Sequence, residues 1–235
     1  MTGRPLRLHP DRLLPADPST RAIARRLLEQ VEPLPIISPH GHCDPRWWAD
    51  DEPFADPATL LITGDHYVLR MLHSAGVRLD ALGRVPLDGG PVADPRRVWR
   101  TFAAHYDLFH ATPSRLWLDH ALSVVLGADV VPDADNADRL FDELSERLAE
   151  PAFRPRALFD RFGIEFLATT ESPLDDLADH RAIRASGATM PIVALTANVM
   201  AEDLARAREA GCTHVATKPI DRPSADEAEH PVRPA

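Results

Sequence analysis

The sequence predicts an α/β protein in which a long helical region separates two short strands and a strand-helix-strand unit follows. Apolar steps at 36–38 and 164–169 are typical of strands. Over about 57–150, apolar residues recur at helical spacing and are interrupted by Pro, Gly and Asp. Residues 191–217 have the pattern of a strand, a helix and a strand in that order, which predicts parallel pairing of the two strands.

The first predicted element is an amphipathic helix near 20–31. Asp17 and Ser19 offer N-terminal caps, because their side-chain oxygens can accept hydrogen bonds from unpaired backbone N–H groups. Pro33 and Pro35 then end the helix. The apolar positions that define its inner face are Ile23, Leu27, Leu28 and Val31.

The later elements are separated by glycine and proline, and the 23 prolines, about twice average usage, favour many short elements. In chain order we expect a helix at 155–162 ended by Gly163, a strand at 164–169, a helix after Pro173, a buried strand at 191–196, a helix at 202–210 ended by Gly211 and a strand at 213–217. The tail, 222–235, combines three prolines with alternating charges and is expected to be disordered.

Composition excludes several classes of function. Lys and Arg number 26 against 36 Asp and Glu, so the formal charge of −10 disfavours nucleic acid and anionic membranes as partners. Cys43 and Cys212 cannot build a disulfide framework, and no apolar run reaches the roughly 18 residues that a membrane span requires. The N-terminus is rich in Arg and Pro and has no apolar signal core, so a cytoplasmic location is expected.

A pair of histidines follows the first strand. Pro39 holds Ser38 extended, and strand alternation places the imidazoles of His40 and His42 on one side. Two neighbouring imidazole nitrogens can bind one divalent ion, and zinc accepts this geometry readily. On spacing alone, however, the favoured interpretation is that both histidines flank a glycine turn and cap polar groups.

Three stretches in a fixed order carry a resemblance to a known family. They are SPHGHCDPRWW at 38–48, GDHYVLRM at 64–71 and FGIEFLATTESP at 162–173. Together they resemble the N-terminal region of uronate isomerases, members of the amidohydrolase superfamily, over roughly residues 5–187. The resemblance implies a (β/α)8 TIM barrel in which a helical insertion separates the first two strands. Only two of eight barrel strands have counterparts here, so an incomplete barrel is expected.

The resemblance also implies an activity and site residues. The family interconverts aldose and ketose hexuronates, D-glucuronate with D-fructuronate and D-galacturonate with D-tagaturonate. His40 and His42 match the metal ligands of the first strand, with zinc the expected cofactor, and Tyr67 and Arg70 match positions near the substrate. A phenol can relay a proton, and a guanidinium can form two hydrogen bonds to a carboxylate. Without the resemblance, Tyr67 would be interpreted as a half-buried helix residue and Arg70 as a solvated charge or a partner of Asp65.

A second resemblance covers the C-terminal region. MPIVALTANVMAED at 190–203 and AGCTHVATKPI at 210–220 resemble the fourth strand, fourth helix and fifth strand of response-regulator receiver domains, which have a flavodoxin-like fold. This resemblance implies that Thr196 and Lys218 contact a phosphoryl group. The family's phosphoacceptor Asp lies upstream of this segment, where the present sequence is isomerase-like, so phosphotransfer is not expected.

The expected organisation is therefore a truncated isomerase-like region at 1–187, a receiver-like fragment at 188–221 and the tail. Impaired or absent isomerase activity is expected, because the remaining metal ligand and acid–base carboxylate of the family come from late strands. A receiver-related interaction module and a nonfunctional fusion fragment are the alternatives. A fused gene, a shifted reading frame and a constructed chimera would all produce this pattern. Docking of the C-terminal unit beside the second barrel strand would leave sheet edges that favour a homo-oligomer.

Overall fold

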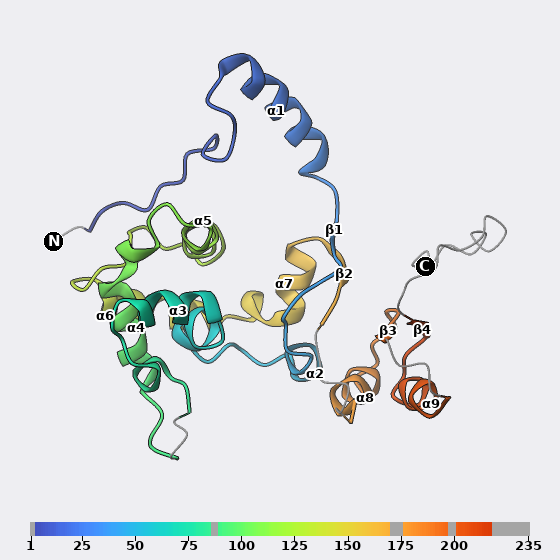
Figure 1. Ribbon diagram of the computed structural model, residues 1–235. Helices are drawn as coiled ribbons and strands as arrows, with labels where there is room; N and C mark the ends of the chain where they lie inside the picture. The colour runs from blue at the N-terminus through green and yellow to red at the C-terminus, as the bar shows by residue number, and fades with distance from the viewer. Residues whose placement is uncertain (1–2, 86–88, 170–175, 197–200, 218–235) are drawn as a thin grey trace. The chain divides into compact units, whose positions relative to one another are not determined.

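The computed structural model describes residues 3–85, 89–169, 176–196 and 201–217 (Figure 1). The chain forms two compact units. The first, here called the helical unit, comprises residues 1–35 and 53–163. The second, here called the strand unit, comprises residues 36–52 and 164–235. Among the described residues, no helix is both long and apolar enough to cross a membrane.

The helical unit contains six α-helices among its described residues. They are α1 (Pro18–Val31), α3 (His66–Ser74), α4 (Pro95–Ala104), α5 (Pro113–His120), α6 (Ala137–Leu148) and α7 (Pro155–Arg161). Short 3₁₀ turns lie at Leu79–Leu82, Tyr106–Phe109 and Pro151–Phe153, and π-helical turns lie at Thr59–Thr63 and Ala121–Val125. The prediction of a long helical region is confirmed.

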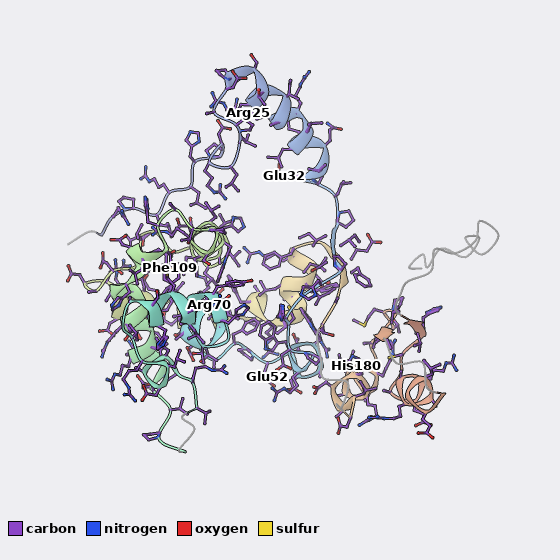
Figure 2. All side chains as sticks on the ribbon, viewed as in Figure 1. Arg25, Glu32, Glu52, Arg70, Phe109 and His180 are labelled. Carbon is purple, nitrogen blue, oxygen red and sulfur yellow. The ribbon has the colours of Figure 1, made fainter. Side chains whose placement is uncertain are left out.

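The core of the helical unit is built on aromatic side chains from α4 and the turn that follows it. Trp99, Phe102 and Phe109 are completely buried, and Tyr106 is 1% exposed. Phe102 lies at the centre of this group, with ring centroids 5.4 Å from Trp99, 5.2 Å from Tyr106 and 5.7 Å from Phe109. Phe109 is labelled among the helices of this unit in Figure 2. The Trp99 indole N–H donates to the carbonyl of Ala137 at 2.9 Å, which ties α4 to the start of α6.

A buried polar network completes this core. The hydroxyl of Tyr106 donates to Oδ1 of Asp119 at 2.9 Å, and Nε of Arg115 donates to the same oxygen at 2.7 Å. The Arg115 guanidinium also lies over the Tyr106 ring, 4.2 Å from its centroid. Burial, and secondarily the Asp119 carboxylate, raise the pKa of Tyr106 well above its usual value of 10.0.

Tyr106 is therefore expected to resist ionisation in the folded protein. The fold favours the neutral phenol, so its stabilising contribution is present below about pH 10 and declines as the pH rises above that unfolded-state value. In a Tyr67→Phe variant, Tyr106 is the sole tyrosine of the chain. Ultraviolet titration of this variant should show phenolate absorbance only when circular dichroism shows unfolding. Phenolate absorbance near pH 10 in a folded sample would contradict the prediction.

Within the helical unit, backbone hydrogen bonds join the N-terminal segment, residues 4–6, to residues 129–131. Pro5 forms an antiparallel bridge with Val130. The N–H of Leu6 donates to the carbonyl of Asp129 at 2.8 Å, and the N–H of Val131 donates to the carbonyl of Arg4 at 2.8 Å. This contact joins residues distant in sequence and was not predicted from the sequence.

The strand unit contains two separate parallel strand pairs. Its described elements are β1 (Ile36–Ser38), α2 (Arg46–Asp50), β2 (Ile164–Leu167), α8 (Ala178–Ala185), β3 (Val193–Thr196), α9 (Ala201–Glu209) and β4 (His214–Thr217). β1 pairs with β2, and β3 pairs with β4. The predicted parallel pairing of the strand-helix-strand unit is confirmed. The possibility that this unit docks beside the second strand is not realised among the described strands, because β3 pairs with β4 and does not join β2.

Arg184 on α8 links the C-terminal strands to the preceding helix. Its Nε donates to the carbonyl of Gly211 at 2.8 Å, and its Nη1 donates to the carbonyls of Ala188 and Met190 at 2.8 and 2.7 Å. Gly211 has φ of +93°, and an added Cβ would lie 2.4 Å from Cγ of Arg184. Glycine is therefore required both by the backbone conformation and by the packing of the arginine.

Candidate functional site

The two histidines of the candidate metal pair lie directly after β1, as predicted. β1 ends at Ser38, whose carbonyl accepts a hydrogen bond from the N–H of Ala168 at 2.9 Å, so the chains leaving β1 and β2 remain adjacent. A Cβ at Gly41 would lie only 2.8 Å from the carbonyl oxygen of Ala168. The residue between His40 and His42 must therefore be glycine, because a larger residue would push the loop away from β2.

The two imidazoles converge. Nε2 of His40 and Nε2 of His42 are 3.2 Å apart, and the rings are nearly perpendicular, with an interplanar angle of 88°. Zinc–nitrogen bonds are about 2.0–2.1 Å long, so two nitrogens on a tetrahedral ion lie about 3.3–3.4 Å apart. The pair therefore fits two adjacent ligands of one such ion. If one ring carries a proton on Nε2 and the other does not, the same two nitrogens can instead form a hydrogen bond with each other.

Within the described part of the chain, the neighbours of this histidine pair do not complete a set of three ligands. Among the described residues, no group of three or more His, Cys, Asp and Glu side chains could hold a metal ion. Burial raises the pKa of the adjacent Cys43 thiol, which disfavours the thiolate that binds metals. The Asp44 carboxylate is paired with Arg46 at 2.7 Å, and hydrogen bonding to Arg46 lowers the pKa of that carboxyl.

Tyr67 and Arg70 belong to the helical unit, where both lie on α3. Asp65 caps this helix, because its Oδ1 accepts hydrogen bonds from the N–H groups of Tyr67 and Val68 at 2.8 and 2.9 Å. The Tyr67 side chain is 59% exposed, and the Arg70 guanidinium lies 5.7 Å from its ring centroid. The structure therefore brings Tyr67 and Arg70 together and leaves the phenol accessible.

One residue near Tyr67 was overlooked in the sequence. His66, directly before Tyr67 on α3, was not among the predicted site residues. Its ring centroid lies 4.1 Å from that of Tyr67, at an interplanar angle of 36°. An imidazole can donate or accept a proton near neutral pH. Its position directly before Tyr67 was the signal that could have identified it.

The receiver-like residues are only partly described. Thr196 is the last residue of β3, and its backbone pairs with Thr217 at the end of β4. Lys218 follows Thr217 in the sequence and lies outside the described residues. The tail at 222–235 also lies outside them.

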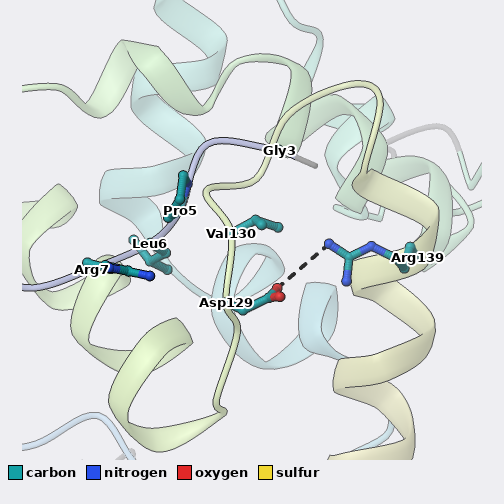
Figure 3. A pocket seen from close by; sticks show the side chains of 7 residues that line it. All are labelled: Gly3, Pro5, Leu6, Arg7, Asp129, Val130 and Arg139. Atoms are coloured by element: carbon teal, nitrogen blue, oxygen red, sulfur yellow. Dashed lines mark ion pairs between the residues drawn. The ribbon is translucent and has the colours of Figure 1, made fainter. Parts of the chain in front are cut away.

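A hollow of about 670 Å³ lies on the helical unit, beside the bridge between the N-terminal segment and Val130 (Figure 3). Its charged lining is partly neutralised, because Arg139 pairs with Asp129 at 3.7 Å and with Glu143 at 2.7 Å. The hollow contains none of the predicted site residues. Its lining consists of Gly3, Pro5, Leu6, Arg7, Asp129, Val130 and Arg139.

Comparison with known proteins gives a consistent set of relatives. The profile of the family "Glucuronate isomerase" matches residues 19–197. The chain is 61% identical to the uronate isomerase of Rhizorhabdus wittichii over 193 residues, which cover 82% of this chain and 40% of the relative. It is 59% identical to the uronate isomerase of Phenylobacterium zucineum over 185 residues, covering 78% of this chain and 38% of the relative.

Solved structures give the same result. The crystal structure of glucuronate isomerase from Caulobacter crescentus superposes with a TM-score of 0.75 and 55% identity, covering 78% of this chain and 38% of that one. The uronate isomerase of Thermotoga maritima superposes with a TM-score of 0.64 and 25% identity, covering 77% and 37%. The fold, mostly helical with short parallel strands, is thus part of the uronate isomerase fold.

The extent of these matches has two consequences. The chain spans about two fifths of the length of the relatives that it matches. The family profile also extends past residue 187 and includes β3, which the sequence had assigned to the receiver-like region. Residues 19–197 make up most of the 235 residues, and the chain therefore belongs to the glucuronate isomerase family.

Proposed function

We propose that this chain carries part of the site for aldose–ketose isomerisation of hexuronates, D-glucuronate to D-fructuronate and D-galacturonate to D-tagaturonate. The convergence of the His40 and His42 nitrogens at 3.2 Å is the observation that carries the proposal. These histidines would hold a divalent ion, with zinc favoured by the all-nitrogen pair. When bound, such an ion polarises a carbonyl or hydroxyl oxygen of the substrate.

Tyr67 and Arg70 are assigned complementary roles in this reaction. Isomerisation moves hydrogen between C1 and C2 of the sugar while the carbonyl moves in the opposite direction. The exposed Tyr67 side chain can relay a proton to or from a substrate oxygen, and the His66 ring lies beside the Tyr67 ring. The Arg70 guanidinium can bind the substrate carboxylate through two parallel hydrogen bonds.

The proposed site lacks groups that the chemistry requires. A pair of histidines leaves at least one protein ligand of a catalytic zinc ion unsupplied, since such sites usually have three. The site residues of a (β/α)8 barrel come from several strand ends, and among the described residues the proposed barrel portion contributes β1 and β2. We therefore expect the isolated chain to bind the metal weakly and to be inactive or severely impaired.

The test is an isomerase assay with a related enzyme as the positive control. Purified chain is incubated with D-glucuronate or D-galacturonate and zinc, and the ketose is measured by NMR. The Rhizorhabdus wittichii relative, assayed in the same way, serves as the positive control. No ketose above background is expected from the chain alone. Robust turnover would contradict the proposed incompleteness and would show that two histidines with Tyr67 and Arg70 are sufficient.

A receiver-related interaction module is the second candidate. What favours it is the parallel pairing of β3 with β4 across α9, because consecutive strands of a receiver-type doubly wound sheet also pair in parallel. On this proposal 188–221 is a receiver-like fragment without a phosphoacceptor, joined to the isomerase-like region 1–187. Incubation with radiolabelled acetyl phosphate is expected to leave the chain unlabelled. Labelling would favour a signalling function and would contradict the assignment of a fragment.

A further inference from the structure

One arginine side chain spans both connections of the C-terminal strand-helix-strand unit. Nη1 of Arg184, on α8, donates to the carbonyls of Ala188 and Met190, which lie on the segment that leads into β3. Nε of the same residue donates to the carbonyl of Gly211, at the turn between α9 and β4. All of these residues belong to the strand unit, and Figure 1 shows α8, β3, α9 and β4 in the orange and red part of the ribbon. Arg184 therefore holds the entry to β3 and the entry to β4 at once.

The turn that Arg184 contacts is the end of helix α9. The N–H of Gly211 donates to the carbonyl of Arg208 at 3.0 Å, and the N–H of Cys212 donates to the carbonyl of Ala207 at 3.0 Å. With the positive φ of Gly211, these two bonds form a Schellman motif, which ends a helix and sets the direction of the next segment. Because the carbonyl of Gly211 is the acceptor for Arg184, the direction in which the chain leaves α9 is tied to α8.

Apolar burial contributes little to this part of the strand unit. Where burial is described after β2, the buried apolar side chains are Ile183, Ala207, Ala210 and Cys212. Three of these are small, whereas the helical unit buries a group of aromatic rings around α4. Stabilisation by burial grows with the apolar area removed from water, so hydrogen bonds carry a larger share of the stability here. The three bonds of Arg184 are charge-assisted and are therefore stronger than bonds between neutral groups.

The guanidinium of Arg184 is incompletely compensated, which makes the contact reversible. Its Nη2 atom is buried and has no hydrogen-bond acceptor among the described residues. A buried donor without an acceptor destabilises the closed arrangement, because water would satisfy that donor in an open one. Local opening of a small, poorly buried segment also costs less free energy than global unfolding. Opening at Arg184 is therefore expected within the otherwise folded chain.

We infer that Arg184 is a latch that holds β3, α9 and β4 to α8. When closed, the latch fixes both connections and keeps β4 along one edge of β3. When open, it releases the two connections together, frees that strand edge for pairing with another chain, and exposes the buried Cys212 to solvent. α8 and β3 lie within the matched residues 19–197 and Gly211 lies beyond them, so the latch joins the family region to the segment that follows it. The inference rests on contacts within the strand unit and is independent of metal binding and isomerase activity.

The test follows the accessibility of one thiol in the full chain. Cys43 and Cys212 are the two cysteines of the sequence, so a Cys43→Ser background leaves Cys212 as the sole thiol. Cys212 is 9% exposed, so a maleimide reacts with it mainly after opening. Arg184→Met keeps the reach of the side chain and removes its hydrogen bonds. It should raise the labelling rate by about tenfold or more, since one charge-assisted hydrogen bond already contributes about that factor. Amide exchange over residues 211–215, followed by mass spectrometry, should accelerate in parallel.

A matched variant on the same helix separates the latch from general loosening of α8. The Arg181 side chain is 51% exposed, and its guanidinium bonds to the carbonyl of Asp176, which precedes the helix. Arg181→Met removes the same charge from α8 and should change the labelling rate by less than about threefold. Arg184→Lys retains the charge but lacks the planar fork that reaches three carbonyls. Its labelling rate should therefore lie between those of the parent and of Arg184→Met.

Two results would overturn the inference. One is labelling of the Arg184→Met variant at the parent rate, and the other is equal acceleration by Arg184→Met and Arg181→Met. Circular dichroism separates local from global opening, because the helical unit does not depend on Arg184 and should keep its helical signal. If Arg184→Met lost that signal, Arg184→Lys would decide the matter, and labelling of the folded lysine variant at the parent rate would equally exclude the latch.

Discussion

Replacing both His40 and His42 with alanine is expected to abolish specific zinc binding by this chain. The two Nε2 atoms, 3.2 Å apart, are the only converging pair of imidazole nitrogens that the site offers within the described residues. Loss of outer partners of a ligand already weakens metal affinity about 10- to 100-fold, so loss of both ligands should weaken it more than about 100-fold. Zinc bound at a fixed free zinc concentration, measured by equilibrium dialysis and mass spectrometry, should fall to background.

The matched control removes two imidazoles elsewhere. His9 and His110 are exposed residues of the helical unit, and a His9→Ala/His110→Ala variant should retain the zinc content of the parent chain. Circular dichroism of both double variants should match the parent, because all four side chains are exposed. If the His40→Ala/His42→Ala variant kept its zinc, these histidines would be excluded as ligands, and the 3.2 Å approach would be explained by a hydrogen bond between the rings.

The positions of the site residues could be predicted from local sequence because local rules determine them. Strand alternation and Pro39 placed the two histidines after β1, and the structure has them there. The close approach of Gly41 to Ala168 depends on the pairing of β1 with β2, which are separated by more than a hundred residues. Such a contact follows from tertiary structure, so the physical reason for the intervening glycine could not be read from the sequence.

Helix positions were predicted better than burial. Periodicity located α1 correctly, but it could not reveal whether a partner covers Leu27, which is 63% exposed. The Arg184 contacts were also unpredictable, because an arginine near a helix end is normally interpreted as a solvated charge. Its three carbonyl partners are contributed by loops around β3 and β4, and only the folded chain brings them to α8.

Truncating Phe102 to alanine is expected to cause the largest loss of stability of any single change in the helical unit. The ring is completely buried and lies against Trp99, Tyr106 and Phe109. Removing a buried phenylalanine side chain typically costs about 3–5 kcal/mol, because transfer free energy is lost and a cavity remains. Total stability of a domain is about 5–15 kcal/mol, so this change removes a large share of it. Urea unfolding followed by tryptophan fluorescence measures the loss.

Two companion variants make the result interpretable. Val124→Ala removes an apolar group that is 54% exposed, and it should change the free energy of unfolding by less than about 0.5 kcal/mol. Phe102→Leu retains most of the buried volume and should cost less than Phe102→Ala, because the cavity is smaller. A loss below about 1 kcal/mol for Phe102→Ala would mean that the aromatic group around α4 is not the main source of stability. In a Trp47→Phe/Trp48→Phe background, the two remaining tryptophans, Trp99 and Trp117, both lie in the helical unit, so a large loss there would also show that this unit is stabilised by its own core.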